Sequence, residues 1–182
     1  RRRALAGERG PMWIAARRQS AGRGRRGREW VDLTGNLYAT GLYVLDTRPA
    51  DAAQLSFAAA LAASEVCESV VDREKVRLKW PNDVLIDGRK TCGVLLESGS
   101  APGGGLWLAV GIGLNVAAHP RDVERPATDL ATEGGTVTRE AALEQIAASF
   151  SAWLERWRTH GFGPLRDAWL ARAWGIGERC TA

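Results

Sequence analysis

Residues 22–30 alternate glycine with arginine and end on a tryptophan, in the order Gly-Arg-Gly-Arg-Arg-Gly-Arg-Glu-Trp. Glycine lets the backbone take positive φ angles and lets its N–H groups come close to a ligand. Arginine supplies a permanent positive charge and a planar fork of donors that pairs with carboxylates and phosphates. The segment therefore predicts a loop that binds an anion with more than one acidic group.

The same loop, taken alone, allows a second interpretation. Arginine–glycine runs are also typical of flexible segments that bind RNA, and a run of charges is more often a solvated surface than a site. By itself, this segment favours nucleic-acid binding or disorder over an enzyme.

Three further segments combine lysine, asparagine, aspartate or glycine within apolar surroundings. They are Lys-Trp-Pro-Asn-Asp at 79–83, Gly-Arg-Lys-Thr-Cys-Gly-Val-Leu-Leu-Glu at 88–97, and Val-Gly-Ile-Gly-Leu-Asn-Val at 110–116. Taken singly, the first suits a tight turn, the second a hairpin return with exposed charges, and the third close backbone packing in a sheet. The third also lacks the last glycine and the following helix of a dinucleotide-binding fingerprint. Each segment is ambiguous on its own.

Hydrophobic periodicity places these segments on a sheet. Strands are expected over 12–16, 36–46, 77–80, 83–86, 90–97 and 106–116, and the Asp-Gly pair at 87–88 predicts a tight hairpin. Residues 99–105 are expected to form a loop. Helices are expected over 49–70 and 138–158, and a further one starts near Pro164. Hairpin-linked strands with helices between and after them indicate an α+β fold rather than a doubly wound parallel sheet.

Composition is that of one globular domain. The chain has 182 residues, of which 45% are hydrophobic and 25% charged. Much of its net charge of +4 comes from the arginines of 1–3 and 17–28, which concentrates the basic character near the predicted loop. No apolar run is long enough to cross a bilayer, and no apolar stretch of a signal peptide follows the first arginines. We therefore expect no membrane partner.

The cysteines and histidines favour neither a metal site nor a disulfide framework. Cys67, Cys92 and Cys180 are odd in number and far apart in the sequence, which is typical of a reducing compartment and predicts a cytoplasmic location. His119 and His160 are isolated, so we expect surface or loop positions for both and no zinc site.

The four motif segments together resemble the biotin–protein ligase family in order and in spacing. The resemblance extends from about Trp13 to Trp174. It implies the catalytic domain of such a ligase, on a fold similar to that of class II synthetases, with a mixed, largely antiparallel sheet packed with helices. A joint match of four segments outweighs the nucleic-acid interpretation of the loop.

The resemblance also implies a reaction. The carboxylate of biotin attacks the α-phosphate of ATP, which gives biotinyl-adenylate and pyrophosphate, and a lysine of a biotin carboxyl carrier domain then attacks the anhydride and forms an amide. Because a carboxylate must approach a polyphosphate, fixed positive charge and Mg²⁺ are needed to cancel the repulsion. The expected ligands are therefore ATP and Mg²⁺, with biotin as the substrate.

Roles carry over from the family residue by residue. Lys90 and Arg25 are implied to be catalytic, with Lys90 reaching both the biotin carboxylate and the α-phosphate. The positions implied to bind biotin are Gln19, Arg23, Gly24, Arg25, Lys90, Gly93, Gly111 and Gly113. The positions implied to bind ATP are Arg28, Trp30, Asn82 and Asn115, and no residue is implied to be a metal ligand. Asp83 is expected to orient the site or the incoming lysine, although a structural role suits it and the glycines equally well.

The chain departs from the family pattern in places that define its expected boundaries. Ser20 stands where the family usually has threonine, and residues 1–18 contain no Ser-Thr-Asn element of the kind that holds biotin. We expect a catalytic domain over 1–176 with a truncated N-terminus, and the start of a missing C-terminal β-domain at 177–182. No DNA-binding domain is visible in the sequence, and a homodimer is compatible with the resemblance.

Three alternatives remain. A lipoate or octanoate transferase shares the fold, but the arginine–glycine loop and the Lys-Trp-Pro-Asn-Asp segment favour biotin. An Arg/Gly-loop nucleic-acid-binding module is the alternative from a different class. The third is a fragment that folds but has no activity.

Overall fold

The computed structural model describes residues 1–121 and 123–177 and contains one six-stranded sheet. Its strands lie in the order β1-β2-β6-β5-β4-β3, and every neighbouring pair is antiparallel. Their bounds are β1 Met12–Ala16, β2 Leu37–Leu45, β3 Val76–Lys79, β4 Asp83–Ile86, β5 Arg89–Ser100 and β6 Leu106–Leu114. The expected α+β class and largely antiparallel sheet are confirmed, and the parallel contacts in the described residues are two isolated bridges, Leu78–Ala173 and Lys90–Ala127.

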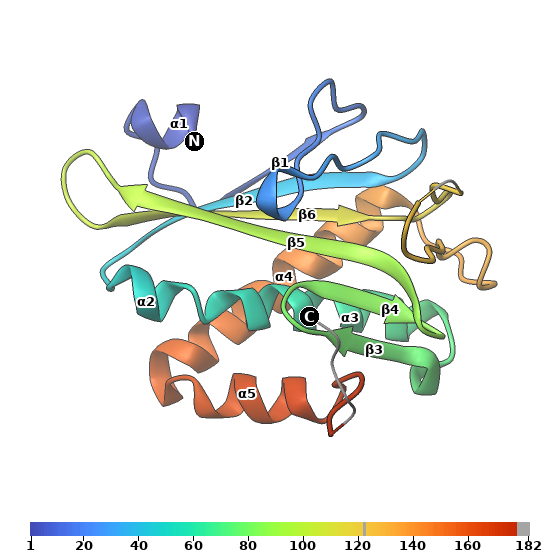
Figure 1. Ribbon diagram of the computed structural model, residues 1–182. Coiled ribbons are helices and arrows are strands. Elements are labelled where there is room, and N and C mark those ends of the chain that lie inside the picture. Colours follow the sequence, from blue (N-terminus) through green and yellow to red (C-terminus); the bar gives the residue numbers. More distant parts are fainter. Residues whose placement is uncertain (122, 178–182) are drawn as a thin grey trace.

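The long helices lie together on one face of this sheet (Figure 1). They are α3 Leu55–Val70, α4 Arg139–His160 and α5 Gly163–Leu170. The short helical segments are α1 Arg2–Leu5, η1 Arg25–Gly27, α2 Pro49–Ala52 and η2 Arg73–Lys75. The segment that joins β1 to β2, which contains η1, passes over the opposite face together with α1 (Figure 1). The sheet therefore has one face covered by helices and one face crossed by the arginine–glycine loop.

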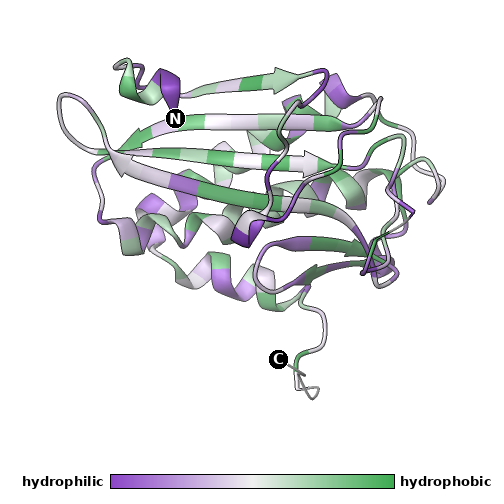
Figure 2. Ribbon diagram, turned by 45° about the horizontal axis from the view of Figure 1, so that its top comes forward, coloured by the Kyte–Doolittle hydropathy of each residue, from purple (hydrophilic) through white to green (hydrophobic). Residues whose placement is uncertain are grey.

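The core follows from the alternation of side chains along β6. Leu108, Val110, Ile112 and Leu114 are buried against the helices, whereas the intervening residues face the loop. Helix α3 is buried on most of its surface, and its alanines let it lie close to both the sheet and α4. Fully burying a leucine such as Leu61 contributes about 1.5–3 kcal/mol, so this layer supplies much of the stability. Figure 2 shows hydrophobic colour on the strands and on the helices, and a hydrophilic loop across the front.

An aromatic cluster joins the edge strand β1 to helix α4. The ring of Trp13 meets Tyr43 and Phe150 edge-on, with ring centroids 6.4 and 6.0 Å apart. Trp13 also donates a hydrogen bond from Nε1 to the Tyr43 hydroxyl at 3.0 Å. Edge-to-face pairs of this kind stabilise by about 0.5–1.5 kcal/mol beyond the area they bury. The cluster thereby fixes the strand from which the arginine–glycine loop departs.

Several element boundaries differ from those that the sequence predicts. The helix expected over 49–70 is divided into α2 and α3, with a break at 53–54. Strand β5 extends to Ser100, so the loop before β6 is confined to 101–105. The extension is stabilised by pairing with β6, in which Gly99 lies opposite Trp107 and a Cβ atom on Gly99 would come within 3.0 Å of the indole. Strand β6 ends at Leu114, two residues earlier than expected.

The cysteines of the described residues are buried thiols. Cys67 and Cys92 are free, and burial raises the pKa of the Cys67 thiol to about 12, which keeps it protonated and unreactive at neutral pH. Cys180 lies outside the described residues, as does all but the first residue of the predicted start of a C-terminal domain at 177–182. Across the part of the chain that is described, no helix combines the length and apolarity needed to span a bilayer.

Candidate active site

A cavity of about 200 Å³ opens on the sheet face that carries the arginine–glycine loop. It is bounded by β2, β5 and β6 and by the segment between β1 and β2. Eight of the predicted site residues line it: Gln19, Arg23, Trp30, Asn82, Lys90, Gly93, Gly111 and Gly113. The sequence segments that are far apart in the chain thus meet at one place.

The floor of this cavity is made of paired glycines. Gly93 lies opposite Gly113 in the register of β5 and β6. A Cβ atom at Gly93 would come within 2.7 Å of the Trp30 ring, and one at Gly113 within 2.6 Å. Because both approaches are shorter than a side chain tolerates, the indole can lie against the sheet only where both residues are glycine. The group that approaches these glycines in this structure is Trp30, and their contact with biotin stays a prediction.

The arginine–glycine loop is a small closed turn. The backbone N–H of Trp30 donates to the Gly22 carbonyl at 3.1 Å, and the backbone N–H of Gly24 donates to the Arg28 carbonyl at 2.7 Å. The turn contains η1, in which Arg26 and Gly27 have φ angles of 56° and 74°. Positive φ at two successive positions explains why a glycine follows the paired arginines.

Lys90 lies between a carboxylate and an aromatic ring. Its Nζ is 2.6 Å from Asp83 Oδ1 and 5.3 Å from the centroid of Trp30. The Asp83 contact is an ion pair, and Oδ1 accepts no hydrogen bond although it is buried. The carboxylate and the face of the aromatic ring both attract the positive charge of the lysine. Asp83 and Lys90 approach each other because β4 and β5 are adjacent strands joined by the hairpin at 87–88.

Two other buried polar atoms in the cavity wall have no hydrogen-bond partner in the described residues. They are the acceptor Gln19 Oε1 and the donor Trp30 Nε1–H. Leaving such an atom unpaired costs about 1–3 kcal/mol, so natural proteins rarely keep one without a reason. An acceptor and a donor that both lack partners are suited to a ligand that carries an N–H and a carbonyl oxygen.

Asn82 belongs to the cavity wall, but its side chain is already engaged. Its Nδ2 donates to the Val94 carbonyl at 2.8 Å, and its own carbonyl accepts from the Val94 N–H at 2.9 Å. These bonds fix the turn between β3 and β4 against β5. The role predicted for Asn82 in ATP binding stays a prediction.

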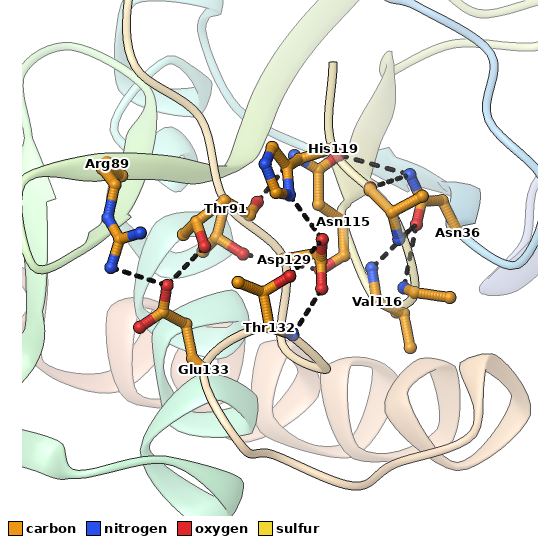
Figure 3. A network of polar contacts seen from close by, with 12 residues as sticks. Asn36, Arg89, Thr91, Asn115, Val116, His119, Asp129, Thr132 and Glu133 are labelled. Carbon is orange, nitrogen blue, oxygen red and sulfur yellow. Dashed lines mark hydrogen bonds and ion pairs between the residues drawn. The ribbon is translucent and has the colours of Figure 1, made fainter. Parts of the chain in front are cut away.

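Four predicted residues do not line the cavity. Gly24, Arg25 and Arg28 belong to the turn of the loop, where both arginines are exposed to solvent. Asn115 is only 4% exposed and is held in a polar network beyond the end of β6 (Figure 3). Its Nδ2 donates to the Thr128 carbonyl at 3.0 Å, and its Oδ1 accepts from Asn36 Nδ2 at 3.4 Å. In this structure Asn115 therefore organises loops beside the cavity. Contact of Arg28 and Asn115 with ATP, and of Gly24 and Arg25 with biotin, stays a prediction.

The sequence does not predict the contacts that two residues of that network make. Asn36 Oδ1 accepts three backbone N–H groups, those of residues 116–118, at 3.0–3.1 Å. His119, expected to be an isolated surface or loop residue, lies in a loop but pairs with the buried Asp129. No local sequence pattern indicates either contact. Asn36, for example, lies about 80 residues before the backbone that it binds.

The chain matches the model of the Biotin/lipoate A/B protein ligase family over residues 5–116. It is 44% identical over 180 residues to the biotin–[acetyl-CoA-carboxylase] ligase of Paracoccus denitrificans, an alignment that covers 95% of this chain and 75% of that protein. It is 33% identical over 175 residues to the bifunctional ligase/repressor BirA of Bacillus subtilis, with 93% of this chain and 54% of that protein covered. It therefore spans about half the length of the BirA relative.

A solved structure of a biotin ligase is also similar to this chain. The biotin protein ligase of Aquifex aeolicus in complex with biotin and ATP superposes with a TM-score of 0.75 at 30% identity, over 91% of this chain and 70% of that one. The chain belongs to the Biotin/lipoate A/B protein ligase family. Within that family it is a biotin–protein ligase catalytic domain, as the sequence predicts.

Proposed function

We propose that this chain joins biotin to AMP at the cavity over β5 and β6 and then transfers biotin to a lysine of a biotin carboxyl carrier domain. The observation that carries the proposal is the convergence of Lys90 with two unpaired polar atoms, Gln19 Oε1 and Trp30 Nε1, in one cavity. The ureido group of biotin offers both N–H donors and a carbonyl acceptor, and its carboxylate offers a partner for Lys90. Family membership supports the same assignment.

In the first step a biotin carboxylate oxygen attacks the α-phosphorus of ATP, and pyrophosphate leaves with the electron pair of the broken P–O bond. Negative charge accumulates between the two reactants, so a positioned cation lowers the barrier. Lys90 is suited to this task because a lysine ammonium on a flexible stem can follow the charge as it moves. In the free protein, Asp83 balances that ammonium at 2.6 Å.

Arg23, Arg25 and Arg28 would face the polyphosphate once the loop moves over the ligand. Among the described residues, Arg25 and Arg28 make no ion pair, and the Arg23 contact to Glu97 is long, at 3.5 Å between exposed side chains. An exposed pair of that kind contributes at most about 1 kcal/mol, so little is lost when a ligand replaces it. The arginines are therefore available to an anion.

Mg²⁺ would enter with the phosphates of ATP. The described residues contain no cluster of three or more His, Cys, Asp or Glu side chains placed to hold a metal ion. Mg²⁺ commonly keeps several waters and binds through phosphate oxygens with one or two carboxylates, so this donor set fits an ion carried by the nucleotide. Asp83 and Glu97 are the carboxylates that border the cavity or its lysine. When bound, the ion would offset charge on the phosphates.

In the second step the amine of the acceptor lysine attacks the acyl carbon of the mixed anhydride, and AMP leaves with the electron pair of the C–O bond. The amine must lose a proton as the amide forms. Asp83 is the carboxylate adjacent to Lys90, and we assign it the orientation of the incoming amine.

The test is biotin-dependent exchange of label between pyrophosphate and ATP, followed by transfer of biotin to a carrier domain. Exchange with biotin and none with lipoate or octanoate is the expected result. Exchange that requires lipoate instead of biotin would show that the chain is a lipoate or octanoate transferase. Absence of exchange together with salt-dependent binding to generic RNA would replace the proposal by the nucleic-acid alternative.

A further inference from the structure

The backbone of Lys90 is held by a segment that lies outside the sheet. Its N–H donates to the Pro126 carbonyl at 2.9 Å, and its carbonyl accepts from the Thr128 N–H at 2.9 Å. These two bonds form the isolated parallel bridge between Lys90 and Ala127. Strand β6 begins to pair with β5 only at Cys92, so residues 126–128 take the place of β6 beside Lys90.

The segment 126–128 is in turn fixed by the polar network of Figure 3. Asn115 Nδ2 donates to the Thr128 carbonyl at 3.0 Å, and the Asn115 carbonyl accepts from the Leu130 N–H at 3.1 Å. The Thr128 hydroxyl donates to Glu133, whose carboxylate pairs with Arg89 at 2.8 Å. Because Arg89 directly precedes Lys90, the network holds this part of β5 from two sides.

One contact closes the base of the loop that carries this segment. His119 Nδ1 lies 2.5 Å from Asp129 Oδ2, and in the sequence these two residues flank the segment that contains 126–128. The side before the loop is anchored, because Asn36 accepts the N–H groups of 116–118. The side after the loop is anchored through Asp129, which also accepts from the N–H of Thr132 at 2.7 Å and from its hydroxyl at 3.1 Å.

Asp129 is buried as a charged group, with only 2% of its surface exposed. Burial raises the pKa of its carboxyl, but hydrogen bonds from His119 and Thr132 outweigh that effect and leave the pKa below its usual value. The other charged groups of the network are Glu133 and Arg89, which pair with each other. A buried carboxylate satisfied by three donors is rigid, and rigid supports of this kind fix the groups attached to them.

We infer that His119 and Asp129 are positioning residues, which hold residues 126–128 against the backbone of Lys90 and thereby fix its ammonium group in the cavity. The inference rests on the function proposed above for Lys90. A long side chain follows any displacement of its backbone, and a misplacement of about 1 Å at a reacting group can cost about a hundredfold in rate. Neither residue lines the cavity, so both act through Lys90.

The first test measures amide hydrogen exchange residue by residue and needs no activity. In His119→Ala, the amides of Lys90 and Thr128 are expected to exchange at least about tenfold faster, because the loop base opens locally. Amides in the centre of the pairing between β2 and β6, such as that of Tyr43, should keep their rates. His119→Asn, whose side-chain N–H can replace Nδ1–H, should restore most of the protection. His160→Ala, an exposed site at the end of α4, is the matched control.

Two outcomes of that experiment would overturn the inference. If the Lys90 and Thr128 amides keep their protection in His119→Ala, the pair does not hold the segment. If all slow amides accelerate by the same factor, the pair contributes to global stability alone.

The second test is a kinetic cycle on biotin-dependent ATP–pyrophosphate exchange. His119→Ala should lower kcat by about fivefold to tenfold and change the KM for biotin and ATP by less than about twofold, since the other binding groups of the cavity stay in place. In a Lys90→Ala background the same substitution should have no further effect, because the residue through which it acts is gone. An equal loss in both backgrounds would contradict action through Lys90. A parent protein without exchange would instead contradict the proposed function, and the amide measurement would still decide the inference.

Discussion

Gly93 faces Gly113 across β5 and β6, and the indole of Trp30 lies on the flat surface that the two residues leave. The cavity floor is thus formed by backbone, and an aromatic side chain from the arginine–glycine loop rests on it. The same ring connects the loop to Lys90, because Lys90 Nζ lies 5.3 Å from its centroid.

Gly113→Ala should separate the loop from the sheet. A methyl group at this position would lie 2.6 Å from the Trp30 ring, so the indole must move. We expect a loss of about 1–3 kcal/mol in the free energy of unfolding in urea, and a smaller rise in melting temperature on addition of biotin with ATP. Gly163→Ala is the control, because its added methyl group meets open space at an ordinary φ angle. An unaltered ligand-induced shift in Gly113→Ala would show that the floor tolerates a side chain.

Lys90→Ala should lower biotin-dependent ATP–pyrophosphate exchange at least about tenfold, which corresponds to roughly 1.4 kcal/mol of transition-state stabilisation. The reason is that Lys90 supplies an ammonium group to the cavity wall, where the proposed reaction brings the carboxylate to the α-phosphate. Lys75→Ala, in the short helix η2 away from the cavity, is the matched control. A folded Lys90→Ala protein with normal exchange would remove Lys90 from the mechanism.

The arginine–glycine loop should become resistant to trypsin when biotin and ATP are present. Arg25, Arg26 and Arg28 are exposed to solvent, and an adenylate in the cavity would draw them inward. Relative to the protein without ligands, cleavage within 22–30 should therefore slow markedly when biotin and ATP are both present. It should slow little when an inert nucleotide is added instead. Arg25→Gly should weaken retention of the adenylate and increase labelling of nearby lysines. Identical digestion patterns with and without ligands would argue against closure.

Asp129 should contribute to stability at neutral pH and lose that contribution in acid. Its folded-state pKa lies below the ordinary value of about 3.9, so the stabilisation is present above that value and disappears as pH falls through the folded pKa. Urea unfolding between about pH 7 and pH 3 should show a shallower acid loss in Asp129→Asn than in the parent protein. Asp167→Asn, at an exposed position of α5, should keep the parent slope. Parallel curves for the parent and Asp129→Asn would contradict the assignment.

Much of the site could be predicted from short-range patterns. The glycines at 93, 111 and 113 and the lysine at 90 stand in strands whose periodicity is plain, and all four line the cavity. Their neighbours could not be predicted in the same way. The position of the Trp30 ring against the sheet depends on how the loop folds back over the strands. No local sequence pattern indicates that fold of the loop.

Asn115 shows where sequence reasoning stops. The motif predicts a contact with ATP, but in the structure its amide binds Asn36 and Thr128, one about 80 residues before it and the other 13 residues after it. The break at 53–54 and the extension of β5 to Ser100 have the same origin, because both depend on packing between distant elements rather than on local propensity. Contacts between distant parts of the chain therefore account for these differences.

The placement of α3, α4 and α5 on one face of the sheet has a consequence for how this domain can change. Substitutions among the buried alanines and leucines of α3 alter packing on the far side of β6 from the ligand, and the strand backbone lies between the two. An engineer could therefore redesign the helical layer for heat tolerance while leaving substrate choice untouched. Conversely, altered acyl substrates can be sought by varying the loop and the cavity side of β5 and β6, at little risk to the interior.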